Sequence, residues 1–311
     1  MPFLPIGGQA VIEGVMMRSP SRMAVAVRRP DGSVGLMERP FVSITQKVRA
    51  LRLPVVRGAV SLFETLYLGI TALNYSADEA ARETDAAPDQ KAPWWQSALQ
   101  GGTVLLSLGL GILLFVVLPA KATSWLGFHD RVGFGLVDGL FRLLAFLLYL
   151  LLISQWKEMA RVLGYHGAEH KAIHAIENRA PLTPESVQSF SRFHPRCGTS
   201  FLFLVVVISI VVFTFIGRPT SVWEHLLRVA CMPVIAGVAF ELIRFSGRYY
   251  DHPIVKAIVW PGMQFQRLTT REPDLTMCEI AIVSLEAVRN DEKVLELERK
   301  PVAKPEMAFI Q

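Results

Sequence analysis

The chain has 311 residues, a formal net charge of +5 and 51% hydrophobic residues. So apolar a composition argues against an ordinary soluble protein and is typical of membrane proteins. The charge is modest and no basic motif interleaved with aromatic residues is present, so no nucleic-acid binding is expected. The three cysteines lie far apart in the sequence, which argues against a disulfide framework and favours a reducing compartment.

Residues 1–55 are expected to form a small cytoplasmic β-rich segment. Two β-prone runs within residues 21–41 flank Pro30-Asp31-Gly32. This tripeptide favours a turn, because glycine accepts positive φ and aspartate hydrogen-bonds its own backbone. The N-terminus has no basic start followed by an apolar run, so no cleaved signal peptide is expected.

Four long apolar runs dominate residues 99–247, and each approaches the ~20 residues that a helix needs to cross a bilayer. They cover residues 101–119, 132–153, 199–216 and 227–245. Tryptophans lie beside the ends of these runs, where amphipathic rings favour the headgroup level: Trp94, Trp95, Trp125, Trp156 and Trp223. We therefore predict a mainly α-helical integral membrane protein with about four transmembrane helices, a small N-terminal β element and additional interfacial or re-entrant helices.

The distribution of lysine and arginine predicts the orientation. Residues 1–100 carry 11 of these residues, the loop 154–200 carries 6 and the chain from residue 246 carries 9. The loops 120–131 and 217–225 carry only 2 and 1. The positive-inside rule then places both termini and the 154–200 loop in the cytoplasm, for a multi-pass protein of the plasma (inner) membrane.

This orientation requires an even number of spans. The apolar stretch 58–75 is long enough for a fifth span, but a fifth crossing would put one basic terminus outside the cell. We therefore interpret residues 56–77 as an interfacial or re-entrant helix and residues 78–98 as a polar linker. Residues 248–311 are expected to form a cytoplasmic C-terminal segment. Within this segment, we interpret residues 252–265 as another interfacial or re-entrant helix. The tail from about 275 to 299 is expected to include a helix.

Three of the seven histidines lie four residues apart within the stretch GYHGAEHKAIHAIEN. On a helix this spacing places His166, His170 and His174 on one face. The first two also match H-x-x-E-H, the zinc pattern of the inverzincins, in which two histidines bind the metal and the glutamate activates water. We therefore predict zinc ligands at His166 and His170 and a general base at Glu169.

A third protein ligand is expected from the stretch FHPRCGTSF, where His194 and Cys197 have ligand-like spacing. Zinc accepts both imidazole and thiolate, and a mixed set excludes magnesium and calcium. With Cys197 as the third ligand, water can take the fourth position and a hydrolytic site results. If His194 also binds, the site is closed and structural. His174 and Glu177 are further candidate ligands.

Charged residues inside the apolar runs have simpler interpretations. Asp138 and Arg142 lie four residues apart and are expected to pair with each other, with a proton path as the alternative. Glu241 and Arg244 are expected to form a local ion pair.

Four motifs in order resemble the bacterial YqhQ-like membrane proteins, a domain-of-unknown-function family (domain of unknown function 1385) described as predicted metal-dependent enzymes. They are GGQAVIEGVMMRSP at 7–20, YHGAEHKAI at 165–173, HPRCGTSF at 194–201 and PGMQFQRLTTREPD at 261–274. The resemblance covers nearly the whole chain and implies that the polar residues of these motifs converge on one membrane-surface site: Glu13, Arg18, His166, Glu169, His170, His194, Arg196, Cys197 and His252.

These observations lead to a hypothesis of a cytoplasm-facing zinc protein that acts as a metal-dependent hydrolase. Arg18 or Arg196 would stabilise negative charge that develops on a phosphate or carbonyl oxygen. The substrate would be a lipid headgroup or a membrane-proximal peptide. The alternative is a non-catalytic assembly or scaffold factor with a structural metal or a hydrogen-bonded His/Cys cluster. Transport is less favoured, because so few spans and intramembrane charges would require an oligomer.

Overall fold

The N-terminal segment forms a four-stranded antiparallel sheet in which strands that follow one another in sequence are neighbours in space. The computed structural model describes residues 6–82, 94–128, 130–250 and 252–289, with the backbone alone for 94–98 and 100. The strands are β1 (Gly7–Val11), β2 (Gly14–Arg18), β3 (Arg22–Arg28) and β4 (Val34–Pro40). The predicted turn joins β3 to β4, with Gly32 at a φ of 83°.

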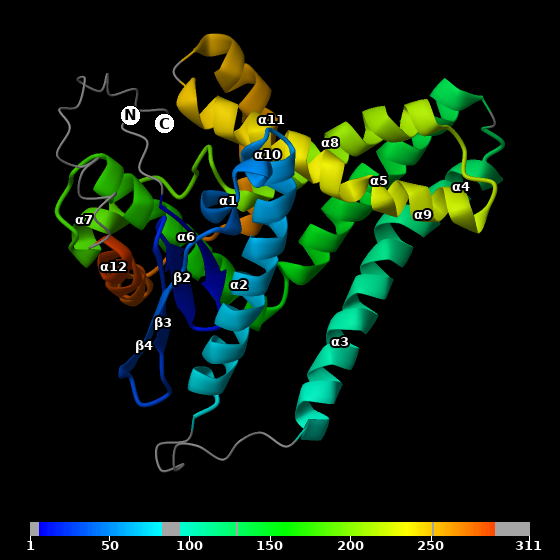
Figure 1. The fold of residues 1–311 in the computed structure, drawn as a ribbon. Coiled ribbons are helices and arrows are strands. Elements are labelled where there is room, and N and C mark those ends of the chain that lie inside the picture. Colours follow the sequence, from blue (N-terminus) through cyan, green and yellow to red (C-terminus); the bar gives the residue numbers. More distant parts are fainter. Residues whose placement is uncertain (1–5, 83–93, 129, 251, 290–311) are drawn as a thin grey trace.

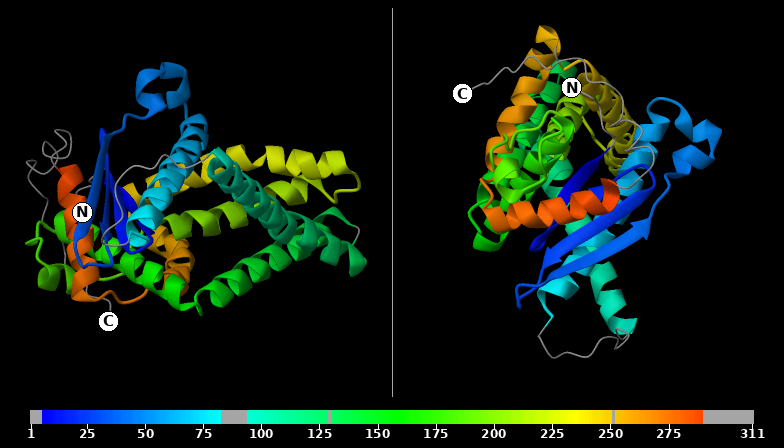
Figure 2. Two further views of the ribbon diagram at one scale, coloured as in Figure 1. Left: turned by 90° about the horizontal axis from the view of Figure 1, so that it is seen from below. Right: turned by 90° about the vertical axis from the view of Figure 1, so that its left-hand side faces the viewer.

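Both faces of this sheet are buried, because successive side chains of each strand point to opposite sides. One face packs against α6 (Lys157–Glu177) and α12 (Leu275–Arg289) through Val15, Met17, Ala24 and Ala26. The other face packs against α2 (Val56–Ala80) through Val11, Met16, Met23, Val25 and Val27. The sheet is therefore the middle layer between α2 and the pair of helices α6 and α12 (Figures 1 and 2).

The apolar helices lie beside and beyond this layered unit (Figure 1). They are α3 (Trp94–Ile112), α4 (Leu118–Trp125), α5 (Arg131–Ile153), α8 (Gly198–Ile216), α9 (Val222–Ala230), α10 (Met232–Arg248) and α11 (Pro253–Thr269). A short π-helical stretch, η2 (Leu113–Val117), joins α3 to α4 without a break. The shorter elements are α1 (Ile44–Lys47), η1 (Arg49–Arg52) and α7 (Pro184–Gln188).

Within the described residues, 5 helical segments are long and apolar enough to cross a membrane, which marks the chain as a membrane protein. Four of them contain the predicted apolar runs: Gly101–Trp125, Arg131–Ile153, Gly198–Ile216 and Val222–Arg248. The fifth is α2, which contains the stretch expected from the sequence to be an interfacial or re-entrant helix. By length and composition alone, α2 also meets the requirement for a span.

Helices extend into both ends of the segment 78–98, which the sequence predicts to be a linker. Helix α2 continues to Ala80 and α3 begins at Trp94, while residues 83–93 lie outside the described residues. The predicted C-terminal helix is confirmed as α12 up to Arg289, and its remaining expected length, 290–299, also lies outside.

A buried cluster of charges joins the apolar helices. The predicted pair of Asp138 and Arg142 is confirmed, with 3.0 Å between Oδ2 and Nε, and Arg228 of α9 lies 3.2 Å from the same oxygen. Arg142 also donates to the carbonyl of Phe115 in η2 at 2.7 Å, and Arg228 donates to the carbonyl of Gly217 at 2.5 Å. One carboxylate thus holds two arginines that bind backbone carbonyls, one in η2 and one directly after α8.

The ion pair of Glu241 differs from the expected one. Its carboxylate pairs with Arg57 of α2, and not with its sequence neighbour Arg244. The reason is a close crossing of α2 and α10, where a Cβ on Gly58 would lie 2.8 Å from the Cα of Gly237. Such a tertiary contact cannot be read from a local charge pattern.

We expect Asp138→Asn to destabilise the protein strongly. The substitution keeps the shape of the side chain but leaves Arg142 and Arg228, which are 3% and 0% exposed, without their counter-charge. Removing one partner of a buried ion pair costs roughly 3–5 kcal/mol. The thermal unfolding midpoint in detergent should fall, whereas Glu158→Gln, at an exposed position of α6, should leave it unchanged. An unaltered midpoint for Asp138→Asn would contradict the role of this cluster.

Candidate metal centre

The candidate site is built on α6, whose second half is buried on nearly every side. Small residues allow this close packing: a Cβ on Gly164 would lie 2.8 Å from the sulfur of Met277 in α12. The buried part also contains polar and charged side chains, namely Glu169, His170, Lys171, His174 and Glu177. Because buried polar groups need partners, neighbouring segments must supply them.

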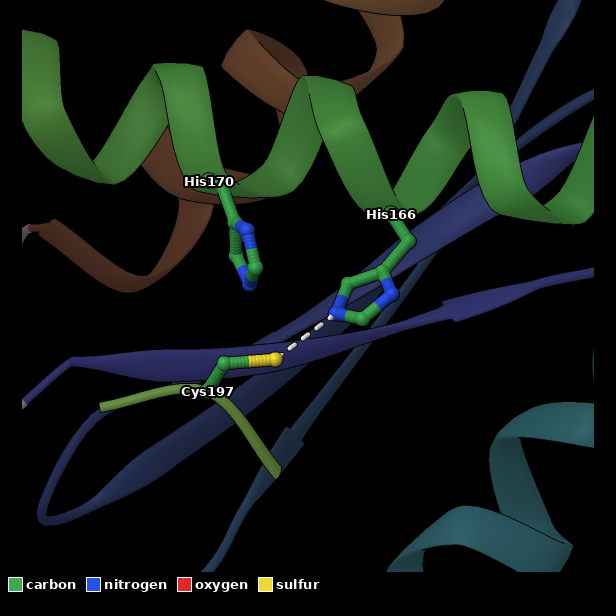
Figure 3. Close-up of side chains that lie close together, drawn as sticks. All are labelled: His166, His170 and Cys197. Atoms are coloured by element: carbon green, nitrogen blue, oxygen red, sulfur yellow. Dashed lines mark hydrogen bonds between the residues drawn. The ribbon is translucent and has the colours of Figure 1, made fainter. Parts of the chain in front are cut away.

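Three predicted ligands meet on one side of α6. His166 and His170 lie one turn apart on the helix, and Cys197, the residue directly before α8, faces them (Figure 3). The Sγ of Cys197 lies 3.3 Å from the Nε2 of His166. One potential ligand atom from each of the three residues lies within 4.8 Å of the others. Of the two candidates for a third ligand, Cys197 is the one grouped with this histidine pair.

The orientation of both imidazole rings is fixed by backbone carbonyls. The Nδ1 of His166 lies 2.7 Å from the carbonyl oxygen of Thr269, and the Nδ1 of His170 lies 2.6 Å from that of Arg192. A carbonyl only accepts, so Nδ1 carries the proton in both rings. This leaves Nε2 of each ring as the nitrogen that can bind a metal, an arrangement typical of metal-binding histidines.

The electrostatics of this cluster favour a thiolate. Burial alone would raise the pKa of Cys197, but the neighbouring His170 and His166 bring that pKa well below its ordinary value. Burial opposes the charged form of His166, whereas the adjacent Cys197 raises its pKa, with a net value of about 9. Cys197 also caps α8, with the Thr199 amide donating to its sulfur at 3.4 Å. A thiolate is the form of cysteine that binds metals and reacts as a nucleophile.

Glu169 lies beside the cluster and is 5% exposed. Burial raises the pKa of its carboxyl, and the nearby Cys197 adds to this, while His170 and His166 lower it. Its carboxylate accepts a hydrogen bond from the backbone of Gly8 in β1. A Cβ on Gly8 would lie 3.1 Å from the Glu169 carboxyl carbon, so only glycine lets the strand approach so closely. The first motif thus reaches the site through its backbone.

A second cluster lies one turn further along α6. It contains His174, Glu177 and His194, and one potential ligand atom from each lies within 4.8 Å of the others. Burial lowers the pKa of both histidines to about 3, helped for His174 by the proximity of His194, so both rings are neutral at pH 7. Arg196 pairs with Glu177 at the edge of this cluster. The predicted ligands therefore form two groups rather than one.

Other predicted residues lie elsewhere. Arg18 points to the α2 side of the sheet, where it lies 3.9 Å from Glu64 and stacks on Phe41. The alternation of a strand explains this, since its neighbour Met17 faces α6 instead. Glu13 pairs with Arg161 at the far end of α6.

His252 also lies apart from the cluster. It is exposed and caps the start of α11, with its Nδ1 accepting the amide of Ile254 at 3.3 Å. Among the described residues, the candidate ligands of the first cluster therefore come from the second and third motifs.

The fourth motif has positioning roles that sequence reasoning missed. Gln266 of α11 accepts the amide of His194 at 2.8 Å and donates to its carbonyl at 2.7 Å. Thr269 supplies the carbonyl that orients His166. In the sequence, the only indication of these roles is that both residues belong to the fourth motif. The spacing of amide and hydroxyl residues on an apolar helix does not predict which residues they will bond.

Comparison with known proteins agrees with the motif resemblance. The family described as "Protein of unknown function (DUF1385)" matches residues 53–291. The chain is 32% identical over 307 residues to "Uncharacterized protein YqhQ" of Bacillus subtilis (strain 168), and the alignment covers 95% of each protein. No solved structure shows a significant match. The protein therefore belongs to the DUF1385 family of YqhQ-like proteins.

Proposed function

We propose that this protein is a zinc-dependent hydrolase at a membrane surface, with His166, His170 and Cys197 as ligands and Glu169 as the general base. One observation carries the proposal: two imidazoles held through Nδ1 and a cysteine favoured as thiolate converge beside a buried carboxylate. Ion pairs and hydrogen bonds that only stabilise the fold do not need two imidazoles, a thiolate and a carboxylate at one point.

The donor set fits zinc. Imidazole nitrogen and thiolate sulfur are its usual ligands, whereas magnesium and calcium require oxygen ligands. Three protein ligands leave the fourth tetrahedral position for water or substrate, as in catalytic zinc sites. Each histidine also has the backbone partner that fixes its ring in metal sites.

The chemistry proposed for the site is activation of water. When bound, zinc supplies a Lewis acid that lowers the pKa of a water molecule. Glu169 would accept a proton from that water, and the burial that raises the pKa of its carboxyl favours this role. Arg18 faces α2, so Arg196, which directly precedes Cys197, is the remaining candidate for stabilising an anionic substrate. In this structure its guanidinium pairs with Glu177.

The substrate proposed is a lipid headgroup or a membrane-proximal peptide. Helix α8, long and apolar enough to span a bilayer, begins at Gly198, directly after Cys197. Helix α11, which orients His166, exposes Ile254, Ile258 and Trp260 at more than half of their surface. Apolar and aromatic residues of this kind favour the membrane interface. The lipid bilayer is therefore the expected partner of this face.

We also propose four spans, with both termini and the site in the cytoplasm. Helix α2 is apolar enough to cross, but its second half packs on the sheet. Its buried carboxylates pair with arginines in or directly after the strands, Glu64 with Arg18 of β2 and Glu79 with Arg29 after β3. An open four-stranded sheet layered along a helix argues against that helix crossing the hydrocarbon region, where unpaired sheet edges are not tolerated.

A non-catalytic scaffold is the second candidate. The observation that favours it is that His170 and His174 hold the carbonyls of Arg192 and Phe193, which ties the loop before α8 to α6. A structural metal or these hydrogen bonds alone would then secure the loop.

Metal content and turnover distinguish the two functions. Purified protein should contain zinc, and His166→Ala/His170→Ala should lose it. Glu169→Gln should keep zinc but lose at least roughly 100-fold in turnover, because general bases contribute about 10²–10⁴-fold. Product release would be measured by mass spectrometry with a mixed bacterial phospholipid extract and a membrane-anchored model peptide.

Glu158→Gln, at an exposed position of the same helix, is the matched control and should retain both zinc and turnover. Turnover that survives in Glu169→Gln would refute the proposed base. Zinc without turnover on either substrate would favour the scaffold.

The close approach of β1 to Glu169 makes a separate prediction. Gly8→Ala places a methyl group 3.1 Å from the carboxyl carbon of Glu169 and 2.5 Å from the carbonyl oxygen of Met16, so the strand or the carboxylate must shift. Turnover should fall by about tenfold or more, since misplacement by 1 Å costs up to about 100-fold. Gly7→Ala, with no atom within 4 Å of its added carbon, should behave as the native protein. Equal turnover of the two variants would show that this contact is unimportant.

Cysteine labelling in intact cells tests the topology. In a Cys231→Ser background, a membrane-impermeant maleimide should label Phe128→Cys but neither Arg39→Cys nor Asp78→Cys, all three at exposed positions. Arg39 precedes α2 and Asp78 lies in its last turn. Labelling of Asp78→Cys with protection of Arg39→Cys would make α2 a fifth span.

A further inference from the structure

The second cluster on α6 has the composition of a metal site in its own right. His174 and Glu177 lie three residues apart on the helix, and His194 faces them from the loop before α8. Their side chains are 9%, 4% and 4% exposed, so they are unlike the surface acidic groups that commonly occur without an ion. Two imidazoles and a carboxylate form one of the common three-ligand sets of catalytic zinc.

The two rings differ in how their nitrogens are bonded. The Nε2 of His174 lies 2.8 Å from the carbonyl of Phe193, so Nε2 carries the proton and Nδ1 is its metal-binding nitrogen. The Nδ1 of His194 accepts the Arg196 amide at 3.2 Å, so its Nε2 carries the proton and donates toward the Oε2 of Glu177 at 3.4 Å. A metal ion bound at the Nε2 of His194 would therefore require the proton to lie on Nδ1, with loss of the bond from the Arg196 amide.

The ion pair between Arg196 and Glu177 is compatible with such a site. Arg196 contacts Oε1 of the carboxylate, while Oε2 is the oxygen that faces His194. Carboxylates that bind metals are commonly hydrogen-bonded by an outer partner, which fixes their orientation. Arg196 takes that place here, with its side chain 15% exposed at the edge of the cluster.

We propose that His174, Glu177 and His194 bind a second divalent transition-metal ion beside the first. The two sites adjoin, because the ring centroids of His170 and His194 are 5.7 Å apart and those of His174 and His194 are 4.7 Å apart. The second site has nitrogen and oxygen donors and no sulfur, so the two ions differ in their ligand chemistry. The inference deepens the proposed function, on which it rests, by making the centre one of two metals.

Cobalt titration of detergent-purified, metal-depleted protein tests this inference. The native protein should bind about two equivalents, of which only that bound at Cys197 produces a sulfur-to-cobalt charge-transfer absorption. Glu177→Gln and His174→Asn should each bind about one equivalent and keep the absorption. His166→Asn/His170→Asn should bind about one equivalent and lose it. Glu185→Gln, at an exposed position of α7, is the control and should match the native protein.

The outcomes separate the two proposals. If the native protein and Glu177→Gln both bind one equivalent of cobalt and both show the absorption, the second site is overturned and the first remains. If the native protein binds one equivalent without the absorption, and Glu177→Gln binds none, the first site is overturned and the second is supported. Two equivalents in Glu177→Gln show that the ligands are wrongly assigned, and no binding in the native protein overturns both. Circular dichroism melting of each variant confirms that lost binding is not lost folding.

Discussion

The cost of burying the polar face of α6 shapes the rest of this protein. Glu169, His170, Lys171, His174 and Glu177 are all less than 10% exposed, and polar groups removed from water must find partners in the fold. Those partners come from segments outside the helix. The end of α7 and the loop before α8 supply carbonyls at Gln188, Arg192 and Phe193, and β1 supplies the amide of Gly8 to Glu169. The end of α11 supplies the carbonyl of Thr269 to the neighbouring His166. These segments therefore have fixed positions against α6.

Close packing on the other side of α6 depends on small residues. The sheet approaches through Gly8, and residue 271 approaches Gly167 so closely that its carbonyl would collide with a Cβ there. A larger side chain at either position would separate the layers and, with them, the groups that surround Glu169. The chemistry of the site thus rests on backbone proximity as well as on the side chains that could bind an ion.

The apolar helices determine where this polar unit stands. Cys197 belongs to both parts, since it caps α8 and faces His166. The cluster of Asp138, Arg142 and Arg228 joins α5, η2 and α9 and holds the bundle that carries α8. Gln266 then connects α11 to His194, so the position of the loop depends on the helices at both of its ends. A site assembled in this way lies where the apolar helices meet the layered domain, which suits a substrate held at a membrane surface.

The sequence alone determined the apolar helices, the hairpin of β3 and β4 and the histidine pair on one helix face. Each of these follows from a local period or spacing: about twenty apolar residues, a turn signal between alternating runs, or a four-residue repeat. The Asp138–Arg142 pair was also predictable, because its members lie one turn apart on one helix.

Tertiary structure alone decided which of Cys197 and His194 joins that pair, why Arg18 faces α2, and why Glu241 binds Arg57. These contacts join residues distant in sequence, or depend on which face of a strand or helix is buried against a neighbour. A local pattern of residues contains no information about either, since the packing of separate elements determines both.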